Sequence, residues 1–253
     1  MKMLIISDVH GNWPALRAVL ETESKFTQIL CLGDLVNYGP MPVECVAWAR
    51  DAFSSGIFLQ GNHDRALGSD TDPRCSTAYT ALAAATQKFT ERMLAPELKQ
   101  FLAGLKPLRR FRLQGAKCVA CHACPKDPLY GYLSETAAVS LWESEVVTAG
   151  LPNVLFLGHT HLPMNMRFLK ALLVNPGSVG QPKDGDPRAA YAVWDDGEVT
   201  LRRAAYDIEE TIRAYAGLGL DTHIERNLCE VLRTGGDLPA EHYQPPKKQP
   251  THG

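Results

Sequence analysis

Histidines, carboxylates and one asparagine recur directly after short apolar runs of this chain, and such side chains are the ones that bind transition metals. The set comprises Asp8, His10, Asp34, Asn62, His122, His159 and His161. A mixture of imidazole nitrogen with carboxylate and amide oxygen suits Mn, Fe, Zn, Co or Ni, whereas Mg alone fits it poorly. The residue types therefore predict a site for transition-metal ions.

One pair of this set, Asp8 and His10, is weak evidence for a metal site when it is taken alone. In an extended segment, residues two positions apart point to the same side, so both side chains can converge on one ion. Taken alone, the pair fits a capping aspartate beside a solvated histidine better. The whole set reverses that balance, because five of the eight histidines stand at predicted strand ends and packing alone does not produce such a distribution.

The elements that must position these side chains alternate between strand and helix in the first part of the chain. Residues 3–7, 28–32 and 56–60 predict short buried strands, and helices are predicted after Asn12 and over residues 42–53. This alternation predicts a parallel sheet. Open sheets of this kind carry their sites at the carboxyl ends of the strands, where the candidate ligands stand.

The rest of the chain predicts a different mixture of elements. Helices are predicted over residues 76–95, 96–105, 135–148, 208–218 and 224–233. Strands are predicted over residues 108–113, 117–122, 154–157, 166–174, 189–194 and 198–205. Hairpin signals between some of these strands predict that this half is largely antiparallel. In the helix over 135–148, Val139, Trp142 and Val146 are predicted to face inward.

The division of the chain follows from where apolar content ends. We expect a single domain over residues 1–236, including the C-terminal helices, and a disordered tail over residues 237–253. The end of the chain is rich in proline and nearly free of apolar residues, so it cannot bury enough surface to fold.

The composition excludes several classes of protein. Of the 253 residues, 45% are hydrophobic and 21% are charged, which allows a substantial core. The formal net charge of −2 argues against a general nucleic-acid binder or a membrane-surface binder, because both need a strongly basic face. No apolar run reaches the length of a membrane span, about 18 residues, so we expect a soluble, cytoplasmic protein.

The seven cysteines predict reduced thiols, because their number is odd and no export signal precedes them. Cys118, Cys121 and His122 match the Cys-x-x-Cys-His pattern of covalent haem attachment, and with Cys124 they could form half of a zinc site. Haem attachment belongs to an export compartment, and no nearby segment supplies a second ligand pair. We therefore expect neither group.

Five sequence blocks, in order, resemble the calcineurin-like metallophosphoesterase family. They are Asp8-Val9-His10, Gly33-Asp34 with Gly39 following, Gly61-Asn62-His63-Asp64, a lone His122, and Gly158-His159-Thr160-His161. The likeness spans residues 4–206, and residues 175–180 with the following hairpin resemble the small prokaryotic phosphodiesterase-like branch. One departure is Ala123, where the family commonly has glycine, so the loop beside the substrate and the substrate itself are expected to differ.

The resemblance implies a centre of two divalent metal ions, with Mn expected first and Fe, Zn, Ni or Co as alternatives. One ion would be held by Asp8, His10 and His161, the other by Asn62, His122 and His159, with Asp34 bridging the two. By the same likeness, His63 would bind phosphate oxygens or protonate the leaving group, and Asp64 would orient it. Asn62 and Arg65 would help to bind the substrate. On the residues alone, His63 also fits a structural histidine and Arg65 a surface arginine paired with an acid.

The resemblance also implies a fold and a reaction. The fold is an α/β, four-layer α/β/β/α sandwich with two mixed β-sheets. The reaction is hydrolysis of small phosphodiesters or phosphomonoesters by attack of a metal-bridging hydroxide. The alternatives are a nucleotide phosphatase, a serine/threonine protein phosphatase, a nuclease and a non-catalytic scaffold.

Sequence features weigh against three of these alternatives. A protein phosphatase usually needs several arginines that clamp the phosphate, and only Arg65 stands near a motif. A nuclease needs a long basic groove, which the near-neutral charge does not offer. A scaffold usually lacks metal ligands or the catalytic histidine, whereas here each ligand and His63 are present. The oligomeric state stays open, a homo-oligomer included.

Two features next to His122 are expected to shape the pocket. Residues 126–133, with Tyr130 and Tyr132, follow this ligand directly and form either one wall of the pocket or an ordinary aromatic packing contact. The thiol of Cys124 is close in sequence to the same ligand, which predicts that oxidation changes activity.

Overall fold

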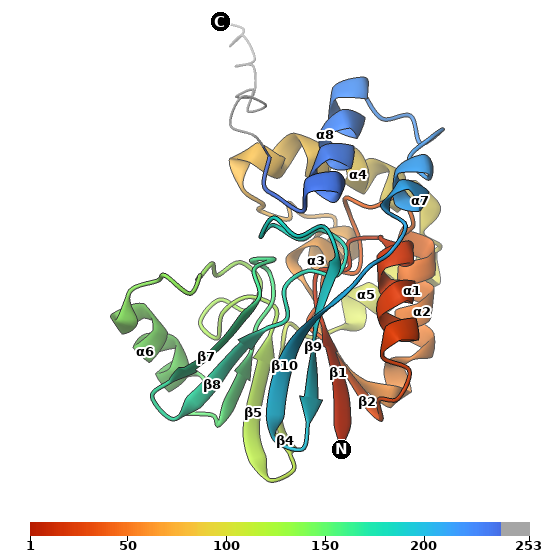
Figure 1. Ribbon diagram of the computed structural model, residues 1–253. Coiled ribbons are helices and arrows are strands. Elements are labelled where there is room, and N and C mark those ends of the chain that lie inside the picture. Colours follow the sequence, from red (N-terminus) through yellow and green to blue (C-terminus); the bar gives the residue numbers. More distant parts are fainter. Residues whose placement is uncertain (239–253) are drawn as a thin grey trace, which may run out of the picture.

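The computed structural model describes residues 1–238 and has two five-stranded sheets face to face, with helices outside (Figure 1). The first sheet has the order β10-β9-β1-β2-β3 and the second β4-β5-β6-β8-β7. The first contains β1 (Lys2–Ile6), β2 (Gln28–Cys31), β3 (Gly56–Phe58), β9 (Ala189–Asp195) and β10 (Glu198–Ala204). The second contains β4 (Leu108–Leu113), β5 (Ala116–Cys121), β6 (Val154–Phe156), β7 (Met164–Phe168) and β8 (Ala171–Asn175). Both sheets combine parallel and antiparallel pairs, so the predicted four-layer sandwich with two mixed sheets is confirmed.

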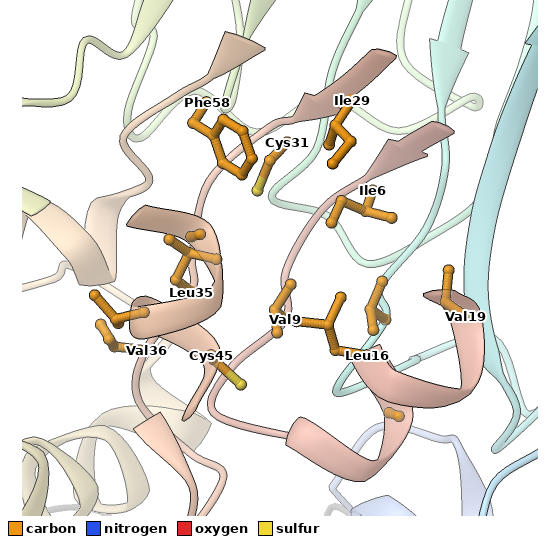
Figure 2. Packing of buried hydrophobic residues seen from close by; sticks show 14 of the residues in the cluster. Ile6, Val9, Leu16, Val19, Ile29, Cys31, Leu35, Val36, Cys45 and Phe58 are labelled. Carbon is orange, nitrogen blue, oxygen red and sulfur yellow. The ribbon is translucent and has the colours of Figure 1, made fainter. Parts of the chain in front are cut away.

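Strand β1 shows how the layers are held together. Its side chains alternate between the two faces of the sheet, so Leu4 and Ile6 pack on the helix side while Met3 and Ile5 pack toward the second sheet. Because both faces are covered, the strand reads as a continuous apolar run. Figure 2 shows the helix side, where Ile6 lies near Leu16 of α1 (Trp13–Thr22).

Helices cover the outer faces of both sheets. The helices α1, α2 (Pro42–Asp51) and α5 (Pro96–Gly104) lie on the first sheet, and α6 (Val139–Thr148) lies on the second (Figure 1). Asn12 begins α1, because its side-chain oxygen accepts a hydrogen bond from the backbone N–H of Ala15. The remaining helices are α3 (Asn62–Ser69), α4 (Thr80–Met93), α7 (Ile208–Arg213), α8 (Thr222–Thr234) and the short 3₁₀ turns η1 (Phe53–Ser55) and η2 (Thr77–Tyr79).

Helices α4 and α8 pack together beyond the carboxyl ends of the strands (Figure 1). Leu82 of α4 and Leu228 of α8 share an apolar cluster with Tyr38 and Tyr79. Tyr38 belongs to the loop after β2, so this cluster joins the two helices to the strand ends where the candidate ligands lie.

Several predicted boundaries are wrong. The single strand predicted over residues 166–174 is the hairpin of β7 and β8, with Leu169 in its turn at a φ of 53°. The helix predicted from residue 135 begins at Val139, which is exposed, although Trp142 and Val146 are buried as predicted. The second half is also less antiparallel than expected, because β6 runs parallel to both of its neighbours.

Two predictions about the organisation of the chain stay predictions. One is that residues 1–236 form a single domain. The other is the disordered tail over 237–253, of which residues 239–253 lie outside the described part of the chain. Among the helices of residues 1–238, none has the length and apolar character that a membrane span requires.

Candidate metal centre

The candidate ligands lie at the carboxyl ends of strands from both sheets, most of them in loops. Asp8 and His10 follow β1, Asp34 follows β2, and His159 and His161 follow β6. All five have a positive φ, between 47° and 65°, which is uncommon for residues other than glycine and recurs at functional sites. Backbone strain therefore concentrates where these side chains meet. Asn62 starts α3 after β3, and His122 follows β5.

Asp8, His10 and His161 form one group, whose ligand atoms all lie within 4.8 Å of one another. Nδ1 of His10 lies 2.9 Å from the carbonyl oxygen of Val36, and Nδ1 of His161 lies 2.6 Å from that of Gln181. A carbonyl oxygen only accepts, so each Nδ1 carries the proton and each Nε2 presents a lone pair. The two Nε2 atoms nevertheless face each other at 3.2 Å. Two facing lone pairs repel, and a cation bound to both of them removes the repulsion.

Asp8 adds a negative charge to this first group. Its Oδ1 lies 3.5 Å from Nε2 of His161 and has no hydrogen-bond partner within the described residues. Its Oδ2 accepts a hydrogen bond from the backbone N–H of His159. A buried carboxylate oxygen without a partner is costly, so this atom fits a metal ligand better than a structural acceptor.

Asp34, His122 and His159 form a second group with the same close spacing. The carbonyl oxygen of Leu32 lies 2.9 Å from Nδ1 of His122, which again leaves Nε2 facing the site. Nε2 lies 2.9 Å from Oδ1 of Asn62, whose Nδ2 donates to the carbonyl oxygen of Pro73. Asn62 therefore presents its oxygen, as a metal ligand must, and either a proton on Nε2 of His122 or a metal ion fits between the two atoms.

Asp34 lies between the two groups. Its Oδ2 is 3.4 Å from Nε2 of His122 and 3.8 Å from Nε2 of His10. Its Oδ1 accepts a hydrogen bond from the backbone N–H of His63, which fixes the orientation of the carboxylate. One anionic group thus faces both sets of ligands, as a bridging ligand would.

The electrostatics of the site favour neutral imidazoles. Burial lowers the pKa of His10 to about 4 and those of His63 and His159 to about 3. His122 differs, because the negative charge of Asp34 outweighs the effect of burial and raises its pKa to about 9. Neutral imidazoles keep a lone pair for a metal ion, and the proton drawn to His122 marks a point that attracts positive charge.

His63 is oriented by a residue that the sequence did not indicate. Its Nδ1 lies 2.8 Å from Nδ2 of Asn37, a donor, so Nδ1 accepts and Nε2 carries the proton. The His63 ring also contacts the edges of the His10 and Tyr38 rings, with centroids 5.2 and 4.9 Å away. Asn37 lies three residues after Asp34, and only the turn of that loop brings it to His63.

Asp64 has a different role from the expected one. Its Oδ2 accepts from the backbone N–H groups of Asp34 and Gly61, and its Oδ1 accepts from that of Leu35. The expected hydrogen bond to the His63 ring is not among the contacts of residues 1–238. Asp64 instead fixes the backbone that carries Asp34. Its bond to Gly61 also caps α3, a helix that the sequence pattern does not predict because its first residues are polar site residues.

A pocket of about 360 Å³ opens onto the candidate ligands. Asp34, Asn62, His63, His159 and His161 form part of its wall, and the rest comes from more distant loops. Those loops contribute Tyr79, Tyr130, Tyr132, Arg74 and Lys183, among others. The segment 126–133 therefore does provide a pocket wall, and the Tyr132 ring contacts His159 with centroids 5.9 Å apart.

Arg65 does not lie in this pocket, although the resemblance proposed it as a substrate-binding residue. It is exposed on α3, and its guanidinium lies 3.5 Å from Oε1 of Gln60. The positive charges of the pocket wall are Arg74 and Lys183, which stand outside the motifs. The sequence carried no signal for them, because only loop geometry brings them to the site.

None of the seven cysteines joins a group of candidate metal ligands within the described residues. All seven are free, as expected. Burial raises the pKa of Cys124 to about 12, so this side chain stays a thiol at neutral pH and is a poor target for oxidation. The sensitivity to oxidation expected from its position in the sequence thus loses its physical basis.

Comparison with known proteins gives the same chemistry. Residues 1–197, which include every candidate ligand, match the family model described as a calcineurin-like phosphoesterase superfamily domain. The chain is 32% identical to the uncharacterized protein MJ0912 of Methanocaldococcus jannaschii, over 81% of this chain and 88% of that protein. It is 26% identical to phosphodiesterase YfcE of Escherichia coli K12, over 78% and 88%. A crystal structure of a metallophosphoesterase from Sphaerobacter thermophilus matches with a TM-score of 0.76 and 31% identity, covering 93% of this chain and 100% of that one.

Proposed function

Since the chain belongs to the calcineurin-like phosphoesterase superfamily and is a metal-dependent phosphoesterase, we propose that it acts on phosphodiesters at a centre of two metal ions. The similarity to a protein named phosphodiesterase supports the preference for diesters. The free cysteines support a cytoplasmic location.

The observation that carries the proposal is the convergence of acceptor atoms. Nε2 of His10 faces Nε2 of His161 at 3.2 Å, and Nε2 of His122 faces the Asn62 oxygen at 2.9 Å. His10 and His161 both donate from Nδ1 to backbone carbonyls, so as neutral imidazoles they cannot form an ordinary hydrogen bond to each other. His122 and Asn62 are joined by a proton on Nε2 of His122, and a metal ion would take the place of that proton. Two cations complete both pairs.

Each ion has its own ligands in this proposal. The first would be held by Asp8, His10 and His161, the second by Asn62, His122 and His159, and Asp34 faces both sets of ligands. The ligand set of nitrogen and oxygen supports Mn²⁺ first, with Fe, Zn, Ni or Co as alternatives. When bound, the ions supply Lewis acidity at phosphorus and lower the pKa of water.

His63 supplies the protein's own hydrogen-bond donor. Because Asn37 donates to Nδ1, the proton of the neutral imidazole resides on Nε2. That N–H donates to a phosphoryl oxygen or to the departing oxygen of the ester, where negative charge develops. Asp64 contributes indirectly, because its carboxylate holds the backbone of the ligand Asp34 in place.

Hydrolysis of bis(p-nitrophenyl) phosphate and p-nitrophenyl phosphate tests the proposal. The metal-stripped protein is assayed after addition of Mn²⁺, Ni²⁺, Co²⁺, Zn²⁺ or Mg²⁺. We expect faster turnover of the diester, with Mn²⁺ most effective, and losses of about 100-fold or more for Asp34→Asn and His63→Ala. Lys170→Ala, which removes an exposed charge in the turn between β7 and β8, is the control and should retain activity.

The possible results separate the parts of the proposal. If the monoester turns over faster, the diester preference is wrong while the metal centre stands. If folded, metal-binding wild type hydrolyses neither compound with any ion, the diesterase proposal is wrong. If His63→Ala retains full activity, the donor is another group.

A further inference from the structure

Two positively charged side chains line the pocket without an ion pair to any acidic residue of the described part of the chain. Nζ of Lys183 lies 4.0 Å from the centre of the Tyr79 ring, and the guanidinium carbon of Arg74 lies 4.6 Å from the centre of the Tyr130 ring. Among the ion pairs of residues 1–238, none includes Lys183 or Arg74. Each cation rests on an aromatic face, which orients it without neutralising its charge.

Both cations are connected to the candidate metal ligands through the backbone. Arg74 follows Pro73, whose carbonyl oxygen accepts the hydrogen bond that orients Asn62. Lys183 stands two residues after Gln181, whose carbonyl oxygen orients His161. The loops that carry the two charges are thus held in a fixed relation to the two groups of ligands.

The backbone of Arg74 supports this connection. Its φ is 53°, and its N–H donates to Oδ1 of Asp72 at 2.6 Å. A left-handed arginine is uncommon, and it persists where surrounding contacts impose it. The turn at Arg74 is therefore imposed by the loop that also holds Asn62.

Lys183 is partly buried, and its surroundings leave its charge incompletely balanced. Burial lowers the pKa of its ammonium group, and the negative charges of Asp237 and Asp8 offset only part of that effect. Asp237 also lines the pocket, but no ion pair joins it to Lys183 within the described residues. A partly buried cation without a counter-ion among the described residues is unfavourable, so an anion that enters the pocket would stabilise it.

We propose that Arg74 and Lys183 form a subsite for a second phosphate group of the substrate, next to the ester phosphate at the metal centre. This inference rests on the proposed phosphodiesterase function and names the class of substrate: a phosphodiester that carries an additional phosphate. The scissile phosphate is matched by the metal ligands and His63, which lie in the same pocket. Arginine and lysine together offer the charge-assisted hydrogen bonds that a phosphate group accepts.

A matched pair of chromogenic substrates tests this subsite. The p-nitrophenyl ester of thymidine 5′-phosphate and its 3′-phosphorylated counterpart contain the same scissile diester and leaving group and differ by one phosphate. For wild type with Mn²⁺ we expect kcat/KM to be about tenfold or more higher for the 3′-phosphorylated ester. The gain should lie mainly in KM, because the second phosphate is bound alike in the ground and transition states.

Substitutions test which residues are responsible for the higher kcat/KM of the 3′-phosphorylated ester. Arg74→Ala and Lys183→Ala should each bring the ratio of the two kcat/KM values closer to one, and Arg74→Lys should retain part of it. Lys170→Ala removes a positive charge far from the pocket and should keep the wild-type ratio. Because the ratio compares two substrates on the same preparation, a partial loss of folded protein does not change it.

The results distinguish this inference from the function on which it rests. If neither ester nor bis(p-nitrophenyl) phosphate is hydrolysed, the phosphodiesterase proposal fails and the subsite fails with it. If only bis(p-nitrophenyl) phosphate is hydrolysed, the subsite is wrong while the diesterase stands. If both are hydrolysed but wild type does not prefer the additional phosphate, the subsite is wrong while the diesterase stands. A preference that survives both alanine substitutions would also overturn the assignment to Arg74 and Lys183.

Discussion

Two buried carboxylates, Asp8 and Glu23, have opposite surroundings in this protein. Glu23, at the end of α1, accepts from Lys2 at 2.7 Å, from Tyr191 at 3.2 Å and from Arg202. Burial by itself would raise the pKa of Glu23, but Lys2 and Arg202 outweigh it and lower the pKa below its ordinary value. At Asp8 one oxygen lacks a partner within the described residues, and burial raises the pKa to about 7.

The difference separates a structural acid from a functional one. The chain itself supplies the counter-charges of Glu23, so this carboxylate is complete in the folded protein. The carboxylate of Asp8 lies beside the neutral imidazoles of His10 and His161, which supply no counter-charge. Its counter-charge would therefore come from a cation in solution. The contrast can be tested by replacing each carboxylate with its amide.

The largest expected effect is on the activity of Asp8→Asn. We expect Mn²⁺-dependent hydrolysis of bis(p-nitrophenyl) phosphate to fall by about 100-fold or more, since a charged ligand is lost. The metal-free variant should be as stable as wild type or more stable, because a poorly solvated charge has been removed. Urea unfolding in the presence of a chelator measures this. A loss of more than about 1 kcal/mol would mean that Asp8 is a structural acid after all.

Glu23→Gln should show the reverse pattern. Its free energy of unfolding is expected to fall by about 2 kcal/mol, because the charges of Lys2 and Arg202 lose their partner. Hydrolysis at saturating Mn²⁺ should stay within about twofold of wild type. Glu21→Gln, an exposed glutamate of the same helix, is the matched control for urea unfolding. Equal stability of the two variants would contradict the role of Glu23.

The difference in stability between wild type and Glu23→Gln should depend on pH. The pKa of Glu23 in the folded state lies below its ordinary value of 4.5, so the folded protein binds this proton less readily than the unfolded chain. Its stabilising effect is therefore present above pH 4.5 and is lost as the pH falls through the folded-state pKa. We expect the difference in unfolding free energy between wild type and Glu23→Gln to be constant above the ordinary pKa of 4.5 and to narrow as the pH falls below it. A constant difference would exclude titration of Glu23 as its source.

The smallest expected effect concerns Arg65. Because this arginine is exposed and absent from the pocket wall, Arg65→Ala should change kcat/KM for bis(p-nitrophenyl) phosphate by less than about twofold. Arg74→Ala, assayed beside it with the 3′-phosphorylated ester, shows what loss of a pocket arginine does. A large loss in Arg65→Ala would restore the substrate-binding role that the resemblance gave it.

The sequence predicts those parts of the molecule that depend on short, local patterns of apolar and polar residues. Strands β1, β2 and β3 are visible as apolar runs, and each leads directly to a polar residue, so the position of the site follows from the rule for carboxyl ends of parallel strands. The grouping of Asp8 with His10 and His161 required the family likeness, because the segments are about 150 residues apart.

Contacts made by turning loops were not predictable in this way. Asn37 reaches His63, and Asp64 bonds to the backbone of Asp34, only because the loop after β2 folds back over the start of α3. Arg74 and Lys183 belong to loops without periodicity, which give no signal in a sequence. The sequence predicts one strand in place of the hairpin of β7 and β8 because Leu169, in the left-handed turn, is apolar, whereas glycine or asparagine would signal a turn.

The left-handed conformation of Asp8, His10, Asp34, His159 and His161 also bears on how this centre can change through evolution. A valine, isoleucine or threonine at any of these positions would lose the ligand and strain the backbone as well. Glycine tolerates that conformation, so it removes the ligand with little damage to the fold. Descendants that abandon the metal while keeping the sandwich are therefore expected to carry glycine at these five positions, and such substitutions would mark a lost centre in related sequences.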